Sequence, residues 1–282
     1  MLDPAWVALS LSQHIGGKTL RALLHHFDQD TGAILQADEA SLRAVPGVGP
    51  AIARSIRQID LEQVQRDMAR WQKNGIAIIT THDPAYPSRL RKVSDAPPTL
   101  FVRGVWRSQL LARAVAIVGT RSPSNAAESQ AGMLGAALTE QGYAVVSGLA
   151  TGVDTAAHRG TLTVPGAYPI VVLGSGVLNP YPPANRALAQ GVIRIGALCA
   201  EVGPDTRVSP SALVARNRII SGLCQAVIVV ETAADGGAMH AARAALRQGR
   251  TLYVLENSAS GNQELLKDGA RPLRTDLSNL EL

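Results

Sequence analysis

The sequence predicts an α/β protein in which a small helical domain precedes a larger domain built on a parallel sheet. Short apolar runs rich in Val and Ile alternate with helical patterns from residue 114 onward. These runs are nearly continuous, which is typical of parallel strands covered on both faces. Residues 1–72, by contrast, show helical periodicity and little strand signal.

The first 72 residues are predicted to form the helical domain, with a turn like that of a helix-hairpin-helix element. Leu20, Leu23 and Leu24 recur at helical spacing. Pro46-Gly47-Val48-Gly49 then falls between two apolar helical patterns, where glycine permits a tight turn. Exposed amides at such a turn can hold a DNA phosphate. A turn that contacts only protein fits the sequence as well.

Residues 73–110 are predicted to be a connector that packs on the larger domain. Two short β-type runs, 76–80 and 99–102, flank a stretch with four prolines, which interrupt regular structure.

Residues 111–282 are predicted to form the sheet domain. Strands are expected at 115–118, 143–146, 170–173, 195–200, 226–230 and 251–255, with helices at 126–141, 184–190 and 239–248 between them. Right-handed crossovers place the carboxyl ends of such strands along one edge of the sheet, where ligands bind.

Composition excludes several classes of protein. The chain has 282 residues, of which 46% are hydrophobic and 17% charged, and no apolar run approaches the roughly 20 residues of a membrane helix. The start lacks the basic segment of a signal peptide. Two cysteines make neither a disulfide framework nor a four-cysteine zinc site. We expect a soluble cytoplasmic protein with no membrane partner and no bound metal.

The basic residues have an unusual make-up. Of the 27, 23 are Arg and 4 are Lys, and the formal net charge is +5. Arginine forks match phosphate oxygens, which favours a polyanion partner. GC-biased coding explains the arginine excess equally well, so composition leaves both interpretations open.

Candidate anion-binding residues follow the predicted strands. Arg121 comes directly after the first strand, and a loop of small residues with Ser147, Gly148 and Thr151 follows the second. Such a loop opening a helix can cradle an anion with backbone amides. Gly236-Gly237 forms a similar loop after the strand at 226–230.

Two further groups near these loops have competing interpretations. Asp154 and His158 lie one helical turn apart, but two ligands make a poor metal site, so a helix cap or a buried hydrogen bond is favoured. Arg216-Asn217-Arg218 can bridge successive phosphates, or form surface ion pairs instead.

The order of motifs along the chain resembles the DprA/Smf family, the DNA-processing proteins of bacterial natural transformation. The resemblance covers about the whole chain, and its joint order and spacing are specific. The segments that carry it are Tyr86-Pro87, Pro97-Pro98, Val118-Gly119-Thr120-Arg121, Ser147-Gly148, Gly152-Val153-Asp154, Ala157-His158-Arg159-Gly160, Val172-Leu173-Gly174-Ser175-Gly176, Tyr181-Pro182, Asn185-Arg186, Glu201, Arg216-Asn217-Arg218 with the apolar segment that follows, Val230-Glu231 and Gly249-Arg250.

The resemblance implies an extended Rossmann-like fold and a protein that binds single-stranded DNA, forms a homodimer and loads the recombinase RecA onto incoming strands, with no catalysis and no cofactor. Carried over by position, it places Arg121, Ser147, Gly148, Arg216 and Arg218 in a DNA groove, with Asn185 and Arg186 near it. Together with the loop residues, these make up the full set of expected DNA-binding positions: Arg121, Ser147, Gly148, Thr151, Asn185, Arg186, Arg216, Asn217, Arg218, Gly236 and Gly237.

This sequence departs from the family pattern at several of these loops. Thr151 stands where the family usually has Arg, and Asp235 and Glu256 introduce negative charge near the anion site. Only short polar sequence follows Ala270, so we expect a divergent member without the C-terminal winged-helix domain that many members carry.

Two other functions stay open from the residues. The family's fold is similar to that of nucleoside-monophosphate phosphoribohydrolases, but the segment after Gly236-Gly237 lacks the glutamate that those enzymes use. The second open function is that of a scaffold that binds a mononucleotide in the same cradle, because backbone amides hold a free nucleotide as readily as a strand.

Overall fold

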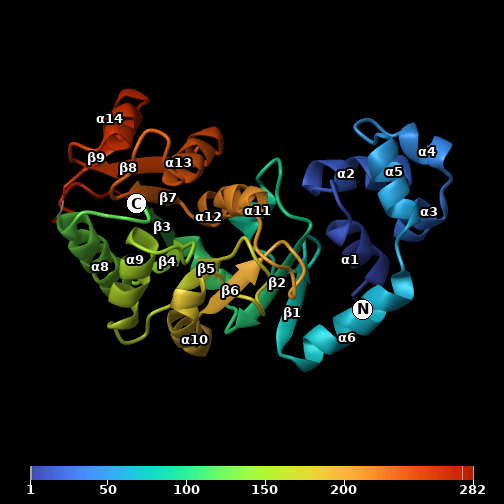
Figure 1. Ribbon diagram of the computed structural model, residues 1–282, viewed down its shortest axis with the longest axis horizontal. Coiled ribbons are helices and arrows are strands. Elements are labelled where there is room, and N and C mark those ends of the chain that lie inside the picture. The colour runs from blue at the N-terminus through green and yellow to red at the C-terminus, as the bar shows by residue number, and fades with distance from the viewer. Residues whose placement is uncertain (1, 275, 282) are drawn as a thin grey trace.

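The computed structural model, which describes residues 2–274 and 276–281, shows a helical unit followed by a nine-stranded sheet with helices on both faces (Figure 1). The helical unit lies to one side of the sheet, next to its β1–β2 edge. The predicted fold class, an α/β protein with an N-terminal helical domain, is confirmed.

The helical unit comprises α1 (Pro4–Leu11), α2 (Gly17–His26), α3 (Thr31–Gln36), α4 (Glu39–Arg43), α5 (Pro50–Arg57) and α6 (Leu61–Lys73). The helices α1, α3, α4 and α6 each begin after an aspartate whose side chain accepts a hydrogen bond from a first-turn amide, an arrangement that stabilises helix starts. Between α4 and α5, Gly47 has a φ of 85°, a conformation that favours glycine. The predicted helix-hairpin-helix turn is therefore present.

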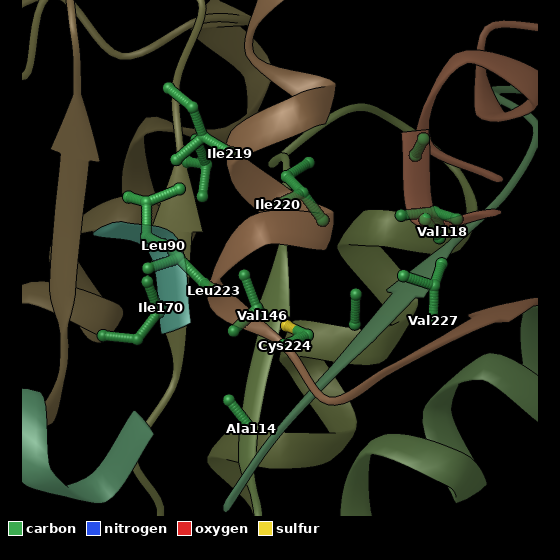
Figure 2. Packing of buried hydrophobic residues seen from close by; sticks show 14 of the residues in the cluster. Leu90, Ala114, Val118, Val146, Ile170, Ile219, Ile220, Leu223, Cys224 and Val227 are labelled. Atoms are coloured by element: carbon green, nitrogen blue, oxygen red, sulfur yellow. The ribbon is translucent and has the colours of Figure 1, made fainter. Parts of the chain in front are cut away.

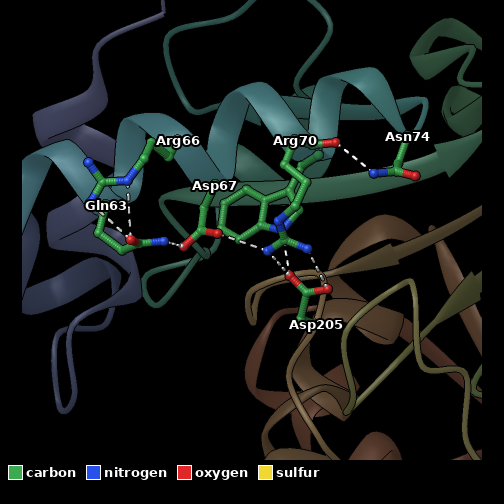
Figure 3. Close-up of polar contacts among 7 residues, drawn as sticks. Gln63, Arg66, Asp67, Arg70, Asn74 and Asp205 are labelled. Carbon is green, nitrogen blue, oxygen red and sulfur yellow. Dashed lines mark hydrogen bonds and ion pairs between the residues drawn. The ribbon is translucent and has the colours of Figure 1, made fainter.

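A polar contact fixes α6 against the sheet domain (Figure 3). The guanidinium of Arg70 donates to both carboxylate oxygens of Asp205, at 3.1 and 2.6 Å, and Trp71 Nε1 donates to the same carboxylate at 2.6 Å. Asp205 lies in the loop after β6 (Ala197–Ala200). The Trp71 ring also packs edge-on against Phe101 of the sheet, with 5.4 Å between ring centroids. The helical unit is thus attached to the sheet by apolar packing as well as by charge.

The sheet has the strand order β1-β2-β6-β5-β4-β3-β7-β8-β9. Its strands are β1 (Ile76–Thr80), β2 (Thr99–Gly104), β3 (Ala114–Val118), β4 (Ala144–Ser147), β5 (Ile170–Val172), β6 (Ala197–Ala200), β7 (Ala226–Val229), β8 (Thr251–Leu255) and β9 (Arg271–Leu273). From β6 to β9 all neighbours pair in parallel, as predicted, whereas β1–β2 and β2–β6 are antiparallel.

Residues 73–110 do more than connect the two parts of the chain. They supply β1 and β2, which pair from Ile76↔Arg103 to Thr80↔Thr99 and extend the sheet at one edge. The prolines lie between these strands, where they do not interrupt pairing. The predicted domain boundaries stay a prediction.

Helices cover both faces because the strands are apolar on both. The helices of the sheet domain are α7 (Ser88–Arg91), α8 (Asn125–Glu140), α9 (Val153–Leu162), α10 (Arg186–Ile195), α11 (Pro210–Ala215), α12 (Asn217–Leu223), α13 (Ala238–Arg247) and α14 (Ser260–Lys267), with 3-10 turns at Ser108–Arg113 and Pro183–Asn185. One face packs Leu90, Ile220 and Leu223 over Val118 and Val146 (Figure 2). The other carries α8 and α9 over β3 and β4, and α10, α1 and α6 beyond them. The carboxyl ends of β3, β4, β5 and β7 lie next to one another along one edge of the sheet.

Within the described residues no helix combines the length and apolar character that crossing a membrane requires.

Candidate functional site

A groove lies at the carboxyl ends of the central strands. It consists of two adjoining pockets of about 410 and 120 Å³, and Arg121, Ala150, Tyr181, Leu213 and Arg216 line both. We call this the carboxyl-end groove. Its position agrees with the rule that open parallel sheets bind ligands at this edge.

Arg121 provides an exposed positive charge at the groove. The turn after β3 is held in place because Thr120 N donates to Glu231 O at 2.7 Å and Val153 N donates to Thr120 O at 3.2 Å. Arg121 follows directly and is exposed. Within the described part of the chain no ion pair engages its guanidinium, so its charge is available to a ligand.

Arg216 provides a second, buried charge. It joins α11 to α12 and is only 6% exposed. Its Nη1 donates to Val172 O at 2.7 Å, and its Nη2 lies 3.8 Å from Asp154 Oδ2. The guanidinium rests directly on Gly148, where a Cβ would lie 1.5 Å from Nη1. Glycine at 148 is therefore needed for the close approach of this side chain.

Asp154 organises the loop after β4 from inside. Its Oδ2 accepts hydrogen bonds from Gly148 N at 3.1 Å and Ala150 N at 3.2 Å. Burial raises the pKa of this carboxyl, and the charge of Arg216 opposes that rise. The loop was expected to cradle an outside anion with its amides, but these two amides already donate to Asp154 and are therefore not available to a ligand.

His158 is buried one turn further along α9, and neither ring nitrogen has a hydrogen-bond partner. Burial, followed by the charge of Arg216, lowers its pKa to about 4, so the ring is neutral at physiological pH. The expected buried hydrogen bond is confirmed for Asp154 and wrong for His158. No cluster of three or more metal-ligating side chains occurs among the residues that the structure describes.

Five of the expected site residues do not line the groove, namely Ser147, Asn185, Arg186, Arg218 and Gly236. Ser147 Oγ donates to Ile117 O at 2.6 Å, and Asn185 Nδ2 donates to Leu149 O at 2.8 Å and Thr155 Oγ1 at 2.7 Å. Both side chains are buried and hold the loop in shape. Arg186 is exposed at the start of α10, outside the lining.

Arg218 is also directed elsewhere. Its guanidinium binds both oxygens of Glu201, at 2.8 and 2.6 Å, and Nε lies 3.4 Å from Asp95 Oδ2. A guanidinium neutralised by two carboxylates has little charge left for a phosphate. The structure therefore does not bring Arg216 and Arg218 together in one groove. Side chains two positions apart on a helix point in different directions.

Of the remaining expected residues, Thr151, Asn217 and Gly237 line the groove, whereas Gly236 does not. Tyr181 and His240 were not among the expected site residues, although both line it. Tyr181 is 40% exposed. The sequence feature that could have identified Tyr181 is an aromatic residue in a loop that follows a strand at this edge.

Comparison with known proteins places the chain in a family. The model of the DNA recombination-mediator protein A family matches residues 77–281, and a model of the SAM-like helix-hairpin-helix tandem matches residues 10–58. Protein Smf of Synechocystis is 33% identical over 281 residues, which is 96% of this chain and 70% of that protein.

Two solved structures are similar throughout or in large part. DNA processing protein A from Streptococcus pneumoniae superposes with a TM-score of 0.81 at 27% identity and covers 100% of this chain and 99% of its own. The Helicobacter pylori protein, described for its single-stranded DNA binding mode, has a TM-score of 0.64 at 26% identity, over 71% of this chain and 92% of its own. The chain belongs to the DNA recombination-mediator protein A family.

Proposed function

We propose that this protein binds single-stranded DNA through its phosphates in the carboxyl-end groove and acts as a recombination mediator in natural transformation. Family membership and the DNA-binding relative from Helicobacter pylori support this function. The observation that carries it is the convergence of exposed Arg121 and buried Arg216 on one groove.

The two arginines make the groove a phosphate site by charge. Burial lowers the pKa of Arg216, and the nearby charge of Arg121 lowers it further. The carboxylate of Asp154 is buried beneath and already accepts two amide hydrogen bonds. A phosphate placed between two like charges relieves their repulsion, and planar guanidinium forks match its oxygens.

The rest of the lining favours a strand over an isolated phosphate. Tyr181, Leu213 and Val214 are apolar or aromatic and lie beside the arginines. They can contact a sugar or a base without reading its identity, since every base has a stacking face. We therefore expect binding with little sequence preference and a clear dependence on salt.

The wider role follows from the family and is part of the same proposal. Residues 1–72 form the helix-hairpin-helix-like domain, 73–110 the connector and 111–282 the DNA-binding domain. The protein works in the cytoplasm as a homodimer, protects incoming DNA and loads RecA, without catalysis or a cofactor.

Fluorescence anisotropy with a labelled oligo-dT tests the DNA site. Arg121→Ala should weaken binding, and the matched control Arg159→Ala, an exposed arginine of α9 outside the groove, should not. A competition series with unlabelled nucleoside monophosphates separates a strand site from a mononucleotide site. If AMP binds tightly and displaces the labelled strand at concentrations near the dissociation constant of AMP, the groove is a mononucleotide site and the DNA proposal is wrong.

A further inference from the structure

A second basic pocket lies at the opposite end of the sheet. It measures about 280 Å³, and Ser88, Arg89, Lys92, Ser108 and Arg250 are among the residues that line it. The 3-10 turn Ser108–Arg113 leads into the amino end of β3, whereas Arg121 follows the carboxyl end of the same strand. A strand of five residues spans roughly 15 Å, so the two sites are separate.

The charge of this amino-end pocket is uncompensated. Three of its lining side chains are cations, and no Asp or Glu is among them. Arg89, Lys92 and Arg250 take part in no ion pair within residues 2–274 and 276–281. By contrast, the half-buried guanidinium of Arg218 has two carboxylates against it.

Carbonyl groups hold the two arginines in place without neutralising them. Arg89 Nη2 donates to Ala112 O at 3.3 Å, and Arg250 Nη2 donates to Arg89 O at 3.2 Å and Gly222 O at 3.4 Å. Both Nε groups are buried without a partner, and no hydrogen bond among the described residues uses either Nη1. Positioned, half-buried donors of one charge are an arrangement that a bound anion stabilises.

The pKa of Arg250 supports the same conclusion. Burial lowers it first, and the nearby charge of Arg89 lowers it further. Two cations held this close without a counter-ion repel each other, and an anion between them removes that repulsion.

We propose that the amino-end pocket is a binding site for a small phosphate-bearing anion, either inorganic phosphate or diphosphate, or the phosphate chain of a nucleotide. Guanidinium forks favour the oxygens of phosphate, and the serine hydroxyls can donate to the same group. The volume is small for a complete drug-sized ligand, so the phosphates themselves are the part recognised. This site is independent of the proposed DNA site.

Isothermal titration of the full chain in a chloride buffer tests the site, with phosphate, diphosphate, AMP and ATP as separate ligands. The variants are Arg250→Gln, Arg89→Gln and Lys92→Gln, the last of which changes an exposed side chain. Arg194→Gln, an exposed arginine of α10 outside the pocket, is the matched control.

At least one of these ligands should bind the wild-type protein, and removing an arginine should weaken that binding about ten- to a hundredfold. Arg194→Gln should leave it unchanged, and the binding that depends on Arg250 should persist in Arg121→Ala. Equal affinity for diphosphate and ATP identifies the phosphates alone as the ligand. Binding of ATP without binding of phosphate or diphosphate identifies a nucleotide as the ligand. No binding up to about 10 mM of any ligand refutes the site. Binding that survives Arg250→Gln and Lys92→Gln but fails in Arg121→Ala assigns the anion to the carboxyl-end groove and also refutes it.

Discussion

Replacing Arg216 with alanine separates the two roles that the structure gives this side chain. The change removes the cation that faces buried Asp154 at 3.8 Å. Breaking a buried pair costs about 3–5 kcal/mol of unfolding free energy, and the low end applies here because Asp154 keeps two amide hydrogen bonds. At about 2 °C per kcal/mol for a chain of this size, the melting temperature should fall by about 6 °C.

The loss of stability should depend on pH in a defined direction. Burial already raises the pKa of Asp154, and removing Arg216 raises it further. A carboxyl with a raised folded-state pKa binds its proton better in the folded protein, so the deficit is largest at neutral pH and shrinks as pH falls towards that pKa. His158 adds to this, because its lowered pKa depends partly on Arg216.

The same variant should lose DNA affinity, and Arg121→Ala should lose it without the stability cost. A charge-assisted hydrogen bond is worth about 1.5–3 kcal/mol, or roughly ten- to a hundredfold in affinity. The salt slope should fall by about 0.7 for each phosphate of the single strand that the variant no longer neutralises. Because Arg121 is exposed, its removal should barely move the melting temperature.

Scanning calorimetry at several pH values and anisotropy at two salt concentrations, with Arg159→Ala as control, measure all of these quantities. Unchanged affinity in both variants would show that the groove is not the phosphate site. A melting temperature of Arg216→Ala equal to that of the wild type would refute the paired, buried role of Arg216.

Three further outcomes are expected. Arg218→Gln should lower stability by about 1–3 kcal/mol in thermal unfolding and leave oligo-dT affinity unchanged, because Glu201 and Asp95 already neutralise this guanidinium; a tenfold drop in affinity would return Arg218 to the groove. No free base should be released from nucleoside monophosphates in a chromatographic assay, since Glu231 is engaged by Ser124 N at 3.0 Å and Ser124 Oγ at 2.6 Å; release that depends on Glu231 would contradict this. Asp205→Asn should cost at most about 1 kcal/mol at neutral pH and less in acid, because Arg70 lowers the pKa of this exposed carboxyl and its stabilisation disappears once it is protonated; a deficit that grows in acid would oppose the assignment.

Local sequence patterns determined most of the fold. Apolar runs such as 115–118 and 251–255 became β3 and β8 because each can bury both faces only as an inner parallel strand. Pro46-Gly47-Val48-Gly49 made the turn between α4 and α5 because few other residue types adopt its backbone conformation. The pairing of β1 and β2 with the sheet was missed, because strand partners far apart in sequence leave no local signal.

Sequence also placed Arg121 at the ligand edge, since the end of a parallel strand fixes where the next residue lies. Only the tertiary structure decided which of the neighbouring arginines faces the groove. Arg216 and Arg218 are two positions apart, and helical geometry directs one to Gly148 and Asp154 and the other to Glu201. Their charges are identical in the sequence, but the carboxylates and backbone that surround a guanidinium determine whether it can receive a phosphate, and those neighbours come from distant parts of the chain.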